Sequence, residues 1–270
     1  MKILSWNIRD LRGHNWDRTR SLTYIFTELK PDIVCLQEVK INCNDSSVID
    51  NLNRYAKSIG YTVHAYSFGG YSGLLTFIKD TPECKYTIWS FDLQGIVGYD
   101  KYNVNRIISL LNEDTKTCII NTYIPNAGTG LCRLGFKELW MKKFSEFIWN
   151  VKFKYNANVI VAGDVNVVPT EKCLDNFKSN YNKTPGCTKV EIDCYNSLLN
   201  TLDMFDVARH YEDYRYTFWS SRRPTNRERN IGWRLDHFWL SKELENNLNS
   251  YDVLSDLKGS DHCPILLELI

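Results

Sequence analysis

Hydrophobic residues along this chain occur in short runs whose spacing alternates between extended and helical patterns. Near the start, apolar runs over Lys2–Ile8 and Asp32–Glu38 predict buried strands. Apolar positions at helical spacing predict helices over Arg18–Lys30 and Val48–Ile59, and Gly60 closes the second of them at a position typical of a left-handed cap. The beginning of the chain therefore reads as strand, helix, strand, helix.

The same alternation continues to the end of the chain. Further helices are predicted over Leu134–Tyr155 and Ile192–Leu202, with a polar loop over Thr170–Lys189. Further strands are predicted over Thr62–Tyr66, Gly73–Ile78, Tyr86–Phe91, Asn105–Leu111, Cys118–Ile124, Val159–Ala162, Tyr216–Trp219, Trp233–Leu240, Tyr251–Leu254 and Ile265–Leu269. Many strands with helices inserted between them favour an α/β fold in which two mixed β-sheets pack face to face and helices cover the outside, a four-layer α/β sandwich.

Composition narrows this picture. The 270 residues include 43% hydrophobic residues and no long polar linker, so we expect a single domain over residues 1–270. Lys and Arg number 33 against 32 Asp and Glu, so any basic surface must come from the distribution of charge and not from its sum.

Nine cysteines occur singly, without zinc-site spacing, which favours a reducing compartment. With no signal-peptide pattern and no membrane-length apolar run, we expect an intracellular protein, nuclear or cytoplasmic, that does not enter a membrane.

Polar side chains stand at or just after the ends of several apolar strands, where packing does not require them. Burying one of them unpaired would cost on the order of 1 to 3 kcal/mol, so their repeated placement predicts a shared polar site. The residues are Asn7, Glu38, Tyr123 with Asn126, Asp164 with Asn166, Asp236, and the pair Asp261–His262.

The chemistry of such a site follows from its residue types. Four carboxylates in one cleft would repel one another unless a divalent cation holds some of them and a histidine pairs with another. Oxygen ligands without a cysteine or several histidines favour Mg²⁺ or Mn²⁺ over zinc. A cation of this kind with a histidine, asparagines and a tyrosine suits phosphodiester hydrolysis better than acyl transfer.

Seven segments, in order along the chain, form a recognisable set of motifs, and six of them contain the polar residues named above. They are Ser5–Asn7, Leu36–Lys40, Tyr71–Gly73, Asn121–Gly128, Gly163–Asn166, Gly232–Asp236 and Gly259–Pro264. Together they resemble the motifs of the exonuclease III family of abasic-site (AP) endonucleases, within the endonuclease/exonuclease/phosphatase superfamily. The resemblance runs from residue 3 to residue 270 and implies a deoxyribonuclease I-like fold.

The resemblance implies an activity and a role for each matching residue. It implies DNA repair by an Mg²⁺-dependent endonuclease, with Mn²⁺ as a substitute, that cuts the phosphodiester 5′ to an abasic site and has possible 3′–5′ exonuclease or 3′-phosphodiesterase activity. The catalytic residues would be Asn7, Tyr123, Asp164, Asn166, Asp236 and His262, and the metal would be bound by Glu38 and Asp261. Phe218, Trp233 and Leu235 would form the pocket for the baseless sugar, and Lys40, Tyr71, Asn126 and Arg133 would contact DNA.

Two positions depart from the family pattern. The family usually places Asn or Asp where this chain has Arg9, and an arginine cannot ligate a cation. Either Asp10 takes over as a metal ligand after a local shift, or the metal site has one ligand fewer. Thr129 stands where vertebrate-like members have an arginine that reaches into the DNA groove, so the grip on DNA would differ.

A basic segment near the end of the chain independently suggests nucleic-acid binding. Arginines are interleaved there with aromatic residues, and Glu228 is the only acidic residue within the segment. This mixture suits phosphate contacts and insertion into a DNA groove, with Arg222 and Arg223 as the expected contacts. The arginines are Arg215, Arg222, Arg223, Arg227, Arg229 and Arg234. We expect a monomer that acts on double-stranded DNA containing abasic sites.

Two alternatives remain open at this point. One is a relative from the same superfamily with another substrate, such as a retroelement-type nicking endonuclease, a general deoxyribonuclease or an inositol-phosphate phosphatase. The other is a non-catalytic DNA-binding homologue, which Arg9 would favour. The motif Gly232–Asp236 argues against the first alternative, and the intact carboxylates and His262 argue against the second.

Overall fold

The computed structural model describes residues 1–81, 85–96 and 103–270, and its strands form two mixed six-stranded sheets. The first sheet has the order β11-β12-β1-β2-β4-β3, in which β1 and β2 are parallel neighbours. Its strands are β1 (Lys2–Asn7), β2 (Ile33–Gln37), β3 (Tyr61–Tyr66), β4 (Leu74–Lys79), β11 (Leu248–Val253) and β12 (Ile265–Leu269).

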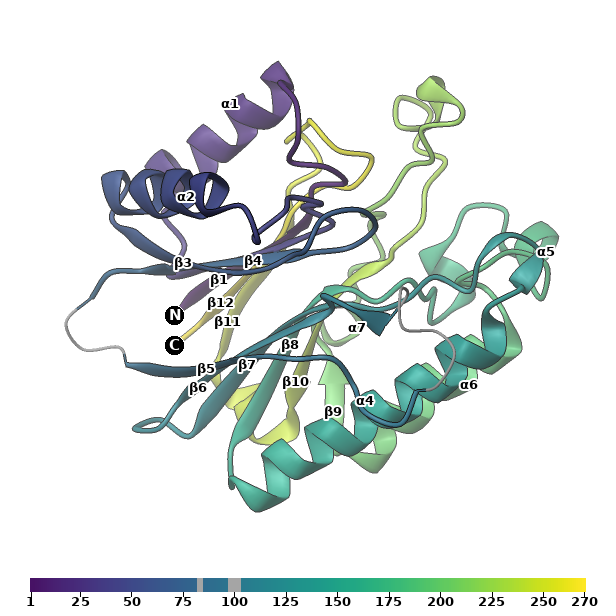
Figure 1. Cartoon of the computed structure of the whole chain (residues 1–270). Helices are drawn as coiled ribbons and strands as arrows, with labels where there is room; N and C mark the ends of the chain where they lie inside the picture. Colours follow the sequence, from purple (N-terminus) through teal and green to yellow (C-terminus); the bar gives the residue numbers. More distant parts are fainter. Residues whose placement is uncertain (82–84, 97–102) are drawn as a thin grey trace.

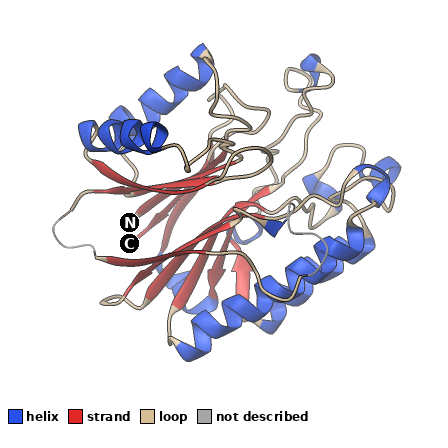
Figure 2. Ribbon diagram, viewed as in Figure 1, coloured by secondary structure: helices blue, strands red, loops and turns tan. Residues whose placement is uncertain are grey.

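The second sheet has the order β5-β6-β7-β8-β10-β9, in which β7 and β8 are parallel neighbours. Its strands are β5 (Tyr86–Ser90), β6 (Ile107–Asn112), β7 (Thr117–Tyr123), β8 (Asn158–Asp164), β9 (Met204–Asp206) and β10 (Asp236–Ser241). The two sheets pack face to face in the middle of the molecule (Figure 2).

Helices cover the outer face of each sheet (Figure 1). On the first sheet lie α1 (Trp16–Tyr24), its π-helical continuation η1 (Ile25–Leu29) and α2 (Ser46–Ser58). On the second sheet lie α4 (Leu134–Lys154) and α6 (Lys189–Thr201), with α7 (Val207–His210) near β9 and β10. Short helical turns occur in the loops at η2 (Thr129–Leu131), η3 (Glu171–Cys173), α5 (Phe177–Asn180), η4 (Pro224–Asn226) and η5 (Lys242–Asn247).

Three apolar layers hold the four structural layers together. The middle layer joins the inner faces of the two sheets and includes Ile3, Ile119 and Phe238. One outer layer joins the second sheet to α4 and α6, and the other joins the first sheet to α1 and α2. Because each sheet is covered on both faces, its central strands are mainly apolar, as the hydrophobic runs in the sequence indicate.

The strand register brings the polar strand ends to one edge of the sandwich. Asp164 at the end of β8 lies opposite Tyr123 on β7 and opposite Asp236 on β10. In the first sheet, Asn7 at the end of β1 lies opposite Gln37, the residue before Glu38. The candidate residues therefore converge because their strands end at the same edge.

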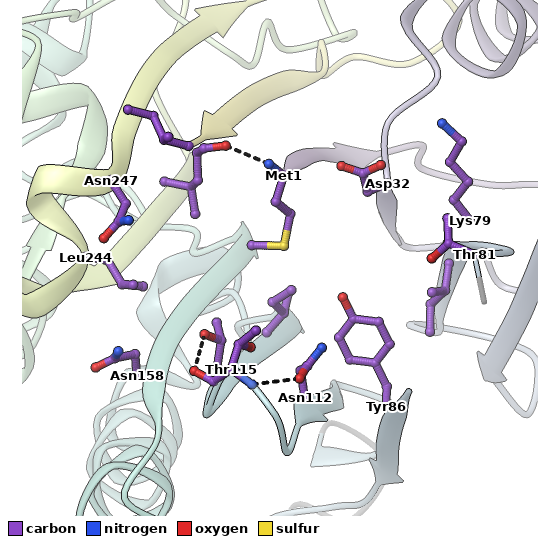
Figure 3. A pocket seen from close by; sticks show the side chains of 15 residues that line it. Met1, Asp32, Lys79, Thr81, Tyr86, Asn112, Thr115, Asn158, Leu244 and Asn247 are labelled. Carbon is purple, nitrogen blue, oxygen red and sulfur yellow. Dashed lines mark hydrogen bonds between the residues drawn. The ribbon is translucent and has the colours of Figure 1, made fainter. Parts of the chain in front are cut away.

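Both chain ends and a cavity lie at the opposite edge of the sandwich. A cavity of about 620 Å³ lies there between the sheets, and its apolar lining includes Ile78 and Ile119. Polar side chains, among them Asp32 and Asn112, stand around it (Figure 3). The amino group of Met1 donates a hydrogen bond to a carbonyl of β12 at 2.6 Å, which fixes the two ends of the chain together.

The four-layer sandwich predicted from the sequence is confirmed, and the differences are local. The predicted strands Tyr216–Trp219 and Trp233–Leu240 are shorter: Phe218 and Trp233 pair only through isolated bridges, and β10 begins at Asp236. The predicted helix Arg18–Lys30 changes to π-helical geometry at Ile25. None of the helices in the described part of the chain has the length and apolarity needed to cross a lipid bilayer.

Candidate active site

A cavity of about 520 Å³ opens at the edge of the sandwich where the polar strand ends meet. Most of the residues that the sequence singles out line it, and Asn7 and Asp236 are buried behind it. The lining includes Glu38, Lys40, Tyr71, Tyr123, Asn126, Asp164, Asn166, Phe218, Arg222, Trp233, Leu235, Asp261 and His262.

Asn7 connects the two sheets at the floor of the cavity. Its side-chain amide donates hydrogen bonds to Glu38 Oε1 at 3.0 Å and to Asp164 Oδ2 at 2.9 Å. Glu38 also contacts Lys40 Nζ at 2.9 Å. Burial would raise the pKa of Glu38, but the charge of Lys40 and hydrogen bonds from Asn7 and Lys40 outweigh this effect and lower it. Glu38 is therefore a carboxylate at neutral pH.

The loop after β8 fixes the orientation of Asp164. Asn166 adopts a left-handed conformation with φ 55°, and its backbone N–H donates to Asp164 Oδ1 at 2.9 Å. Buried Lys137 on α4 donates to the carbonyl oxygen of Asn166 at 2.6 Å and to Glu191 at 2.8 Å. Asn126 donates to the side-chain oxygen of Asn166 at 3.1 Å. The loop is therefore held from both the helix side and the cavity side.

His262 and Asp236 form a buried pair. Nδ1 of His262 lies 2.7 Å from Asp236 Oδ2, which also accepts a hydrogen bond from the hydroxyl of Thr217 at 2.6 Å. Nε2 of His262 faces Asp164 Oδ2 at 3.8 Å. Burial alone would lower the pKa of His262, but the charges of Asp236 and Asp164 outweigh it and raise the pKa to about 10. His262 is therefore an imidazolium near neutral pH.

Asp164 has the opposite balance of effects. Burial raises its pKa to about 7, and the nearby charges of Asp236 and Glu38 act in the same direction, while His262 opposes the rise. A carboxylate whose pKa lies near neutral can accept a proton from water and still be ionised at physiological pH. Asp164 is thus the residue of the cavity best placed to act as a general base.

Tyr123 stands between Glu38 and a buried arginine. Its hydroxyl forms a hydrogen bond with Glu38, and the guanidinium of Arg106 lies 4.7 Å from the centre of its ring. Arg106 also donates to the carbonyl oxygen of Tyr123 at 2.8 Å. Burial, followed by the charge of Glu38, raises the pKa of Tyr123 well above its ordinary value. Its hydroxyl therefore keeps its proton and can donate it to a developing negative charge.

One wall of the cavity is apolar and firmly held. The backbone N–H groups of Phe218 and Trp233 each donate to the carbonyl of the other at 2.9 Å. The ring of Phe218 lies 4.8 Å from the ring of His262. Leu235 completes this wall beside the polar half of the cavity. An apolar surface thus adjoins the ionisable groups directly.

Comparison with known proteins identifies the family. The sequence matches the model of the Endonuclease/Exonuclease/phosphatase family over residues 4–262. The chain belongs to this family. Together with the relatives described below, this match confirms the predicted resemblance to AP endonucleases of the exonuclease III type.

Relatives within the endonuclease/exonuclease/phosphatase family match nearly the whole chain. An exodeoxyribonuclease of Bacillus subtilis (strain 168) is 33% identical over 271 residues, which cover 99% of this chain and 98% of that protein. The DNA-(apurinic or apyrimidinic site) endonuclease of Dictyostelium discoideum is 34% identical over 273 residues, 98% of this chain and 69% of that protein.

A longer relative and a solved structure give the same result. The chain spans 37% of the length of recombination repair protein 1 of Drosophila melanogaster, to which it is 34% identical. The crystal structure of AP endonuclease LMAP from Leishmania major superimposes with a TM-score of 0.82 at 25% identity, covering 99% of this chain and 87% of that one.

Some residues that the sequence singled out lie outside the cavity. Asp10 faces Arg12, which contacts both of its carboxylate oxygens at 3.0 and 2.8 Å. The hydrogen bond from Arg12 lowers the pKa of Asp10 to about 2. Arg133 lies beside the cavity, within 3.4 Å of the hydroxyl of Tyr71. Arg223 is exposed on its loop but does not line the cavity.

Three of the six arginines in the basic segment between Tyr214 and Asp236 are held by contacts within the protein. Arg234 is fully buried and pairs with Asp206 at 2.7 Å. Arg227 donates to three backbone carbonyls and covers the ring of Trp219. Arg215 is held by two aspartates on neighbouring segments. Arg222, Arg223 and Arg229 are exposed.

Sequence reasoning missed residues that act through distant contacts. Arg106, Thr217 and Lys137 each touch a candidate residue from a segment that the motifs do not include. Thr184 lines the cavity from the polar loop after β8. A signal did exist for Arg106 and Lys137, since each charged side chain interrupts a segment with an apolar pattern.

The donor set of the cavity fits a hard divalent cation. Its charged ligand candidates, Glu38 and Asp261, offer only oxygen, and each faces a cationic side chain, Lys40 at 2.9 Å and Arg9 at 3.7 Å. Among the described residues, no three His, Cys, Asp or Glu side chains form a closed metal cage. Mg²⁺ does not need one, because it keeps several waters and binds through one or two carboxylates. Members of the AP endonuclease branch depend on a divalent metal, and these residues suit one.

Proposed function

We propose that the chain is a Mg²⁺-dependent AP endonuclease that hydrolyses the phosphodiester 5′ to an abasic site in duplex DNA and leaves a 3′-hydroxyl group. We add a weaker 3′–5′ exonuclease or 3′-phosphodiesterase activity as part of the proposal. One observation carries the assignment: a general base with its pKa near neutral and an imidazolium share a cavity with an apolar wall. The general base and the imidazolium suit hydrolysis of a phosphodiester, and the apolar wall can accept a sugar that has no base.

In the proposed reaction, Asp164 orients a water molecule and accepts its proton as the water oxygen attacks phosphorus. Asn7 and Asn166 hold Asp164 in place, and the imidazolium of His262 donates a hydrogen bond to a non-bridging phosphate oxygen. Asp236 keeps His262 protonated and correctly oriented. As the bond between phosphorus and the 3′ oxygen breaks, the hydroxyl of Tyr123 donates a proton to that oxygen, which leaves as the 3′-hydroxyl group.

Glu38 would hold the divalent cation, with Mn²⁺ able to replace Mg²⁺. The bound cation supplies Lewis-acid stabilisation of the charge that develops on the phosphate. Glu38 is suited to this role because it remains ionised and lines the cavity, where its neighbour Lys40 is itself a polar wall residue.

The substrate side of the proposal rests on the cavity wall and its rim. Phe218, Trp233 and Leu235 would receive the flipped-out abasic sugar. Arg222, Lys40, Tyr71 and Asn126 line the same cavity, and with Arg133 and Arg223 beside it they would bind the DNA backbone. We propose that the chain does this as a monomer.

The proposal is tested with three substrates in parallel. The chain is incubated with a duplex that carries one tetrahydrofuran abasic analogue, with the same duplex undamaged, and with a phosphoinositide. Each reaction is run with Mg²⁺ and with chelator. We expect internal cleavage only beside the analogue, any shortening from the 3′ ends to be slower, and both to need Mg²⁺. Cleavage of the undamaged duplex or of the lipid at an equal rate would contradict the proposal, and so would binding without cleavage.

A further inference from the structure

Arg9 occupies an unusual backbone position at the mouth of the cavity. It follows β1 and adopts a left-handed conformation with φ 64°, which favours glycine, asparagine and aspartate over arginine. The turn is fixed, because the backbone N–H of Arg9 donates to the side-chain oxygen of Asn7 at 2.9 Å. An arginine kept in this conformation directly beside a candidate catalytic residue points to a function for its side chain.

The side chain of Arg9 reaches the site without being locked there. It lines the main cavity and also the adjoining cavity of about 380 Å³, and Asp261 lies between them as a wall of both. Its Nη1 is 3.7 Å from Asp261 Oδ2, close enough for charge attraction and too far for a hydrogen bond. Its side chain is 54% exposed, and within the described part of the chain its guanidinium donates no hydrogen bond. Its donors therefore face the cavity and are available to a ligand.

The neighbouring carboxylate cannot supply a metal ligand in its place. Asp10 is held on both oxygens by Arg12 and does not line the main cavity. The guanidinium of Arg9 thus supplies positive charge next to Asp261 without a bound cation. A planar guanidinium matches two oxygens of one phosphate group.

We propose that Arg9 binds a backbone phosphate of the DNA substrate and that its charge beside Asp261 limits the site to one divalent cation, anchored by Glu38. This inference rests on the proposed nuclease function, since it assigns both the cation number and a substrate contact to that site. The non-bridging oxygens of the phosphate accept from the guanidinium while Asp261 balances part of its charge. The site then needs only one exchangeable cation.

The phosphate contact is tested by DNA binding in chelator, where no cleavage or metal binding contributes. The Kd for the tetrahydrofuran duplex is measured by fluorescence anisotropy across a series of salt concentrations for the wild type and Arg9→Gln. Arg54→Gln, on the outer helix α2, is the matched control. We expect Arg9→Gln to weaken binding about 10- to 100-fold, the range for losing a charge-assisted hydrogen bond. The salt slope should fall by about one unit, as expected for one lost phosphate contact.

The cation number is tested by Mn²⁺ titration followed by electron paramagnetic resonance. The wild type should bind one Mn²⁺ per chain, and Arg9→Asn should bind Mn²⁺ more tightly or take up a second ion. Asparagine suits the left-handed conformation, so this variant should unfold at the same temperature as the wild type or higher.

Two results would overturn the inference: an unchanged Kd and salt slope for Arg9→Gln, or two Mn²⁺ ions bound to the wild-type chain. Failure of the wild type to cleave the abasic analogue would count against the proposed incision reaction alone, because neither measurement depends on turnover.

Discussion

Asp236 and His237 are neighbours on β10, yet each belongs to a different buried cluster of aspartate and histidine. The cavity cluster consists of Asp164, Asp236 and His262 and opens to solvent through the main cavity. The interior cluster consists of Asp206, Arg234, His237 and Tyr195 and is fully buried. Both clusters contain aspartate and histidine, and the interior cluster adds a tyrosine and a fully buried arginine, Arg234.

That arginine reverses the protonation of its neighbours. In the interior cluster, burial and the charge of Arg234 lower the pKa of His237, so this histidine stays neutral. Burial would raise the pKa of Asp206, but Arg234 outweighs it and holds the pKa far below its ordinary range. In the cavity cluster no lysine or arginine of the described residues pairs with Asp164 or Asp236, and His262 takes up the proton itself. The buried charge of Arg234 fixes the protonation states of the interior cluster. Without such a charge, the groups of the cavity cluster can exchange protons with a substrate or with water.

The largest effect is expected from breaking the interior cluster. Asp206→Asn removes the counter-ion of fully buried Arg234, and the free energy of unfolding should fall by about 3 to 5 kcal/mol. Asp193→Asn is the matched control, because Asp193 forms only an exposed pair with Lys189 and should change stability by less than about 1 kcal/mol. Urea denaturation measures both variants. Equal losses in the free energy of unfolding would show that the interior cluster stabilises the fold no more than an exposed ion pair does.

A pair of tyrosine variants should separate the two clusters by phenotype. The hydroxyl of Tyr195 donates to Asp206 at 2.8 Å and accepts from Trp239 at 3.1 Å, so Tyr195→Phe should lower the free energy of unfolding by about 1 to 3 kcal/mol without changing kcat. Tyr123→Phe should instead lower kcat about 100-fold with little change in stability, because its hydroxyl adjoins the reacting groups. Denaturation curves and single-turnover rates are measured for both. A loss of stability alone for Tyr123→Phe would remove it from the proposed mechanism.

Measured per pH unit, the smallest effects are two stability slopes of opposite sign. The folded-state pKa of His262 is raised to about 10 against about 6.5 unfolded, so its stabilising contribution is complete below pH 6.5 and is lost as pH rises toward 10. The pKa of His237 is lowered, so its contribution is lost as pH falls below about 6.5, where only the unfolded state takes up the proton.

These slopes are measured as differences in unfolding free energy between the wild type and each glutamine variant, in chelator. The difference for His262→Gln should shrink as pH rises, and the difference for His237→Gln should shrink as pH falls, each by at most about 1.4 kcal/mol per pH unit. Slopes of the same sign would mean that the pKa values of the two histidines are not shifted in opposite directions, and that Arg234 does not have the effect described.

Much of the fold was predictable because its strands are long, apolar and bounded by turn residues. Val159–Ala162 and Ile265–Leu269 needed no tertiary information. The three-residue strand β9 was missed because it is too short to show a period. Phe218 and Trp233 carry a strand-like pattern but form only bridges, because the chain turns there to build the cavity wall.

Residues of the site could be predicted where polar side chains follow apolar strands. Residues that reach the site only through contacts made on folding could not. Asn7, Glu38, Asp164 and His262 converge as predicted, although their roles remain proposals. Arg234 was assigned to a DNA-binding surface because the sequence shows a run of arginines and does not show that Asp206 lies beneath this one. Thr217 and Arg106 gain their importance only through contacts that folding creates.

Single-turnover cleavage by Asp164→Asn tests the account most directly. The variant keeps the shape of the side chain and removes the base, so cleavage beside the abasic analogue should slow about 10²- to 10⁴-fold while the Kd for that DNA stays unchanged. Asp193→Asn should cleave like the wild type. A near-wild-type cleavage rate for Asp164→Asn would contradict the claim that the cavity cluster performs the hydrolysis.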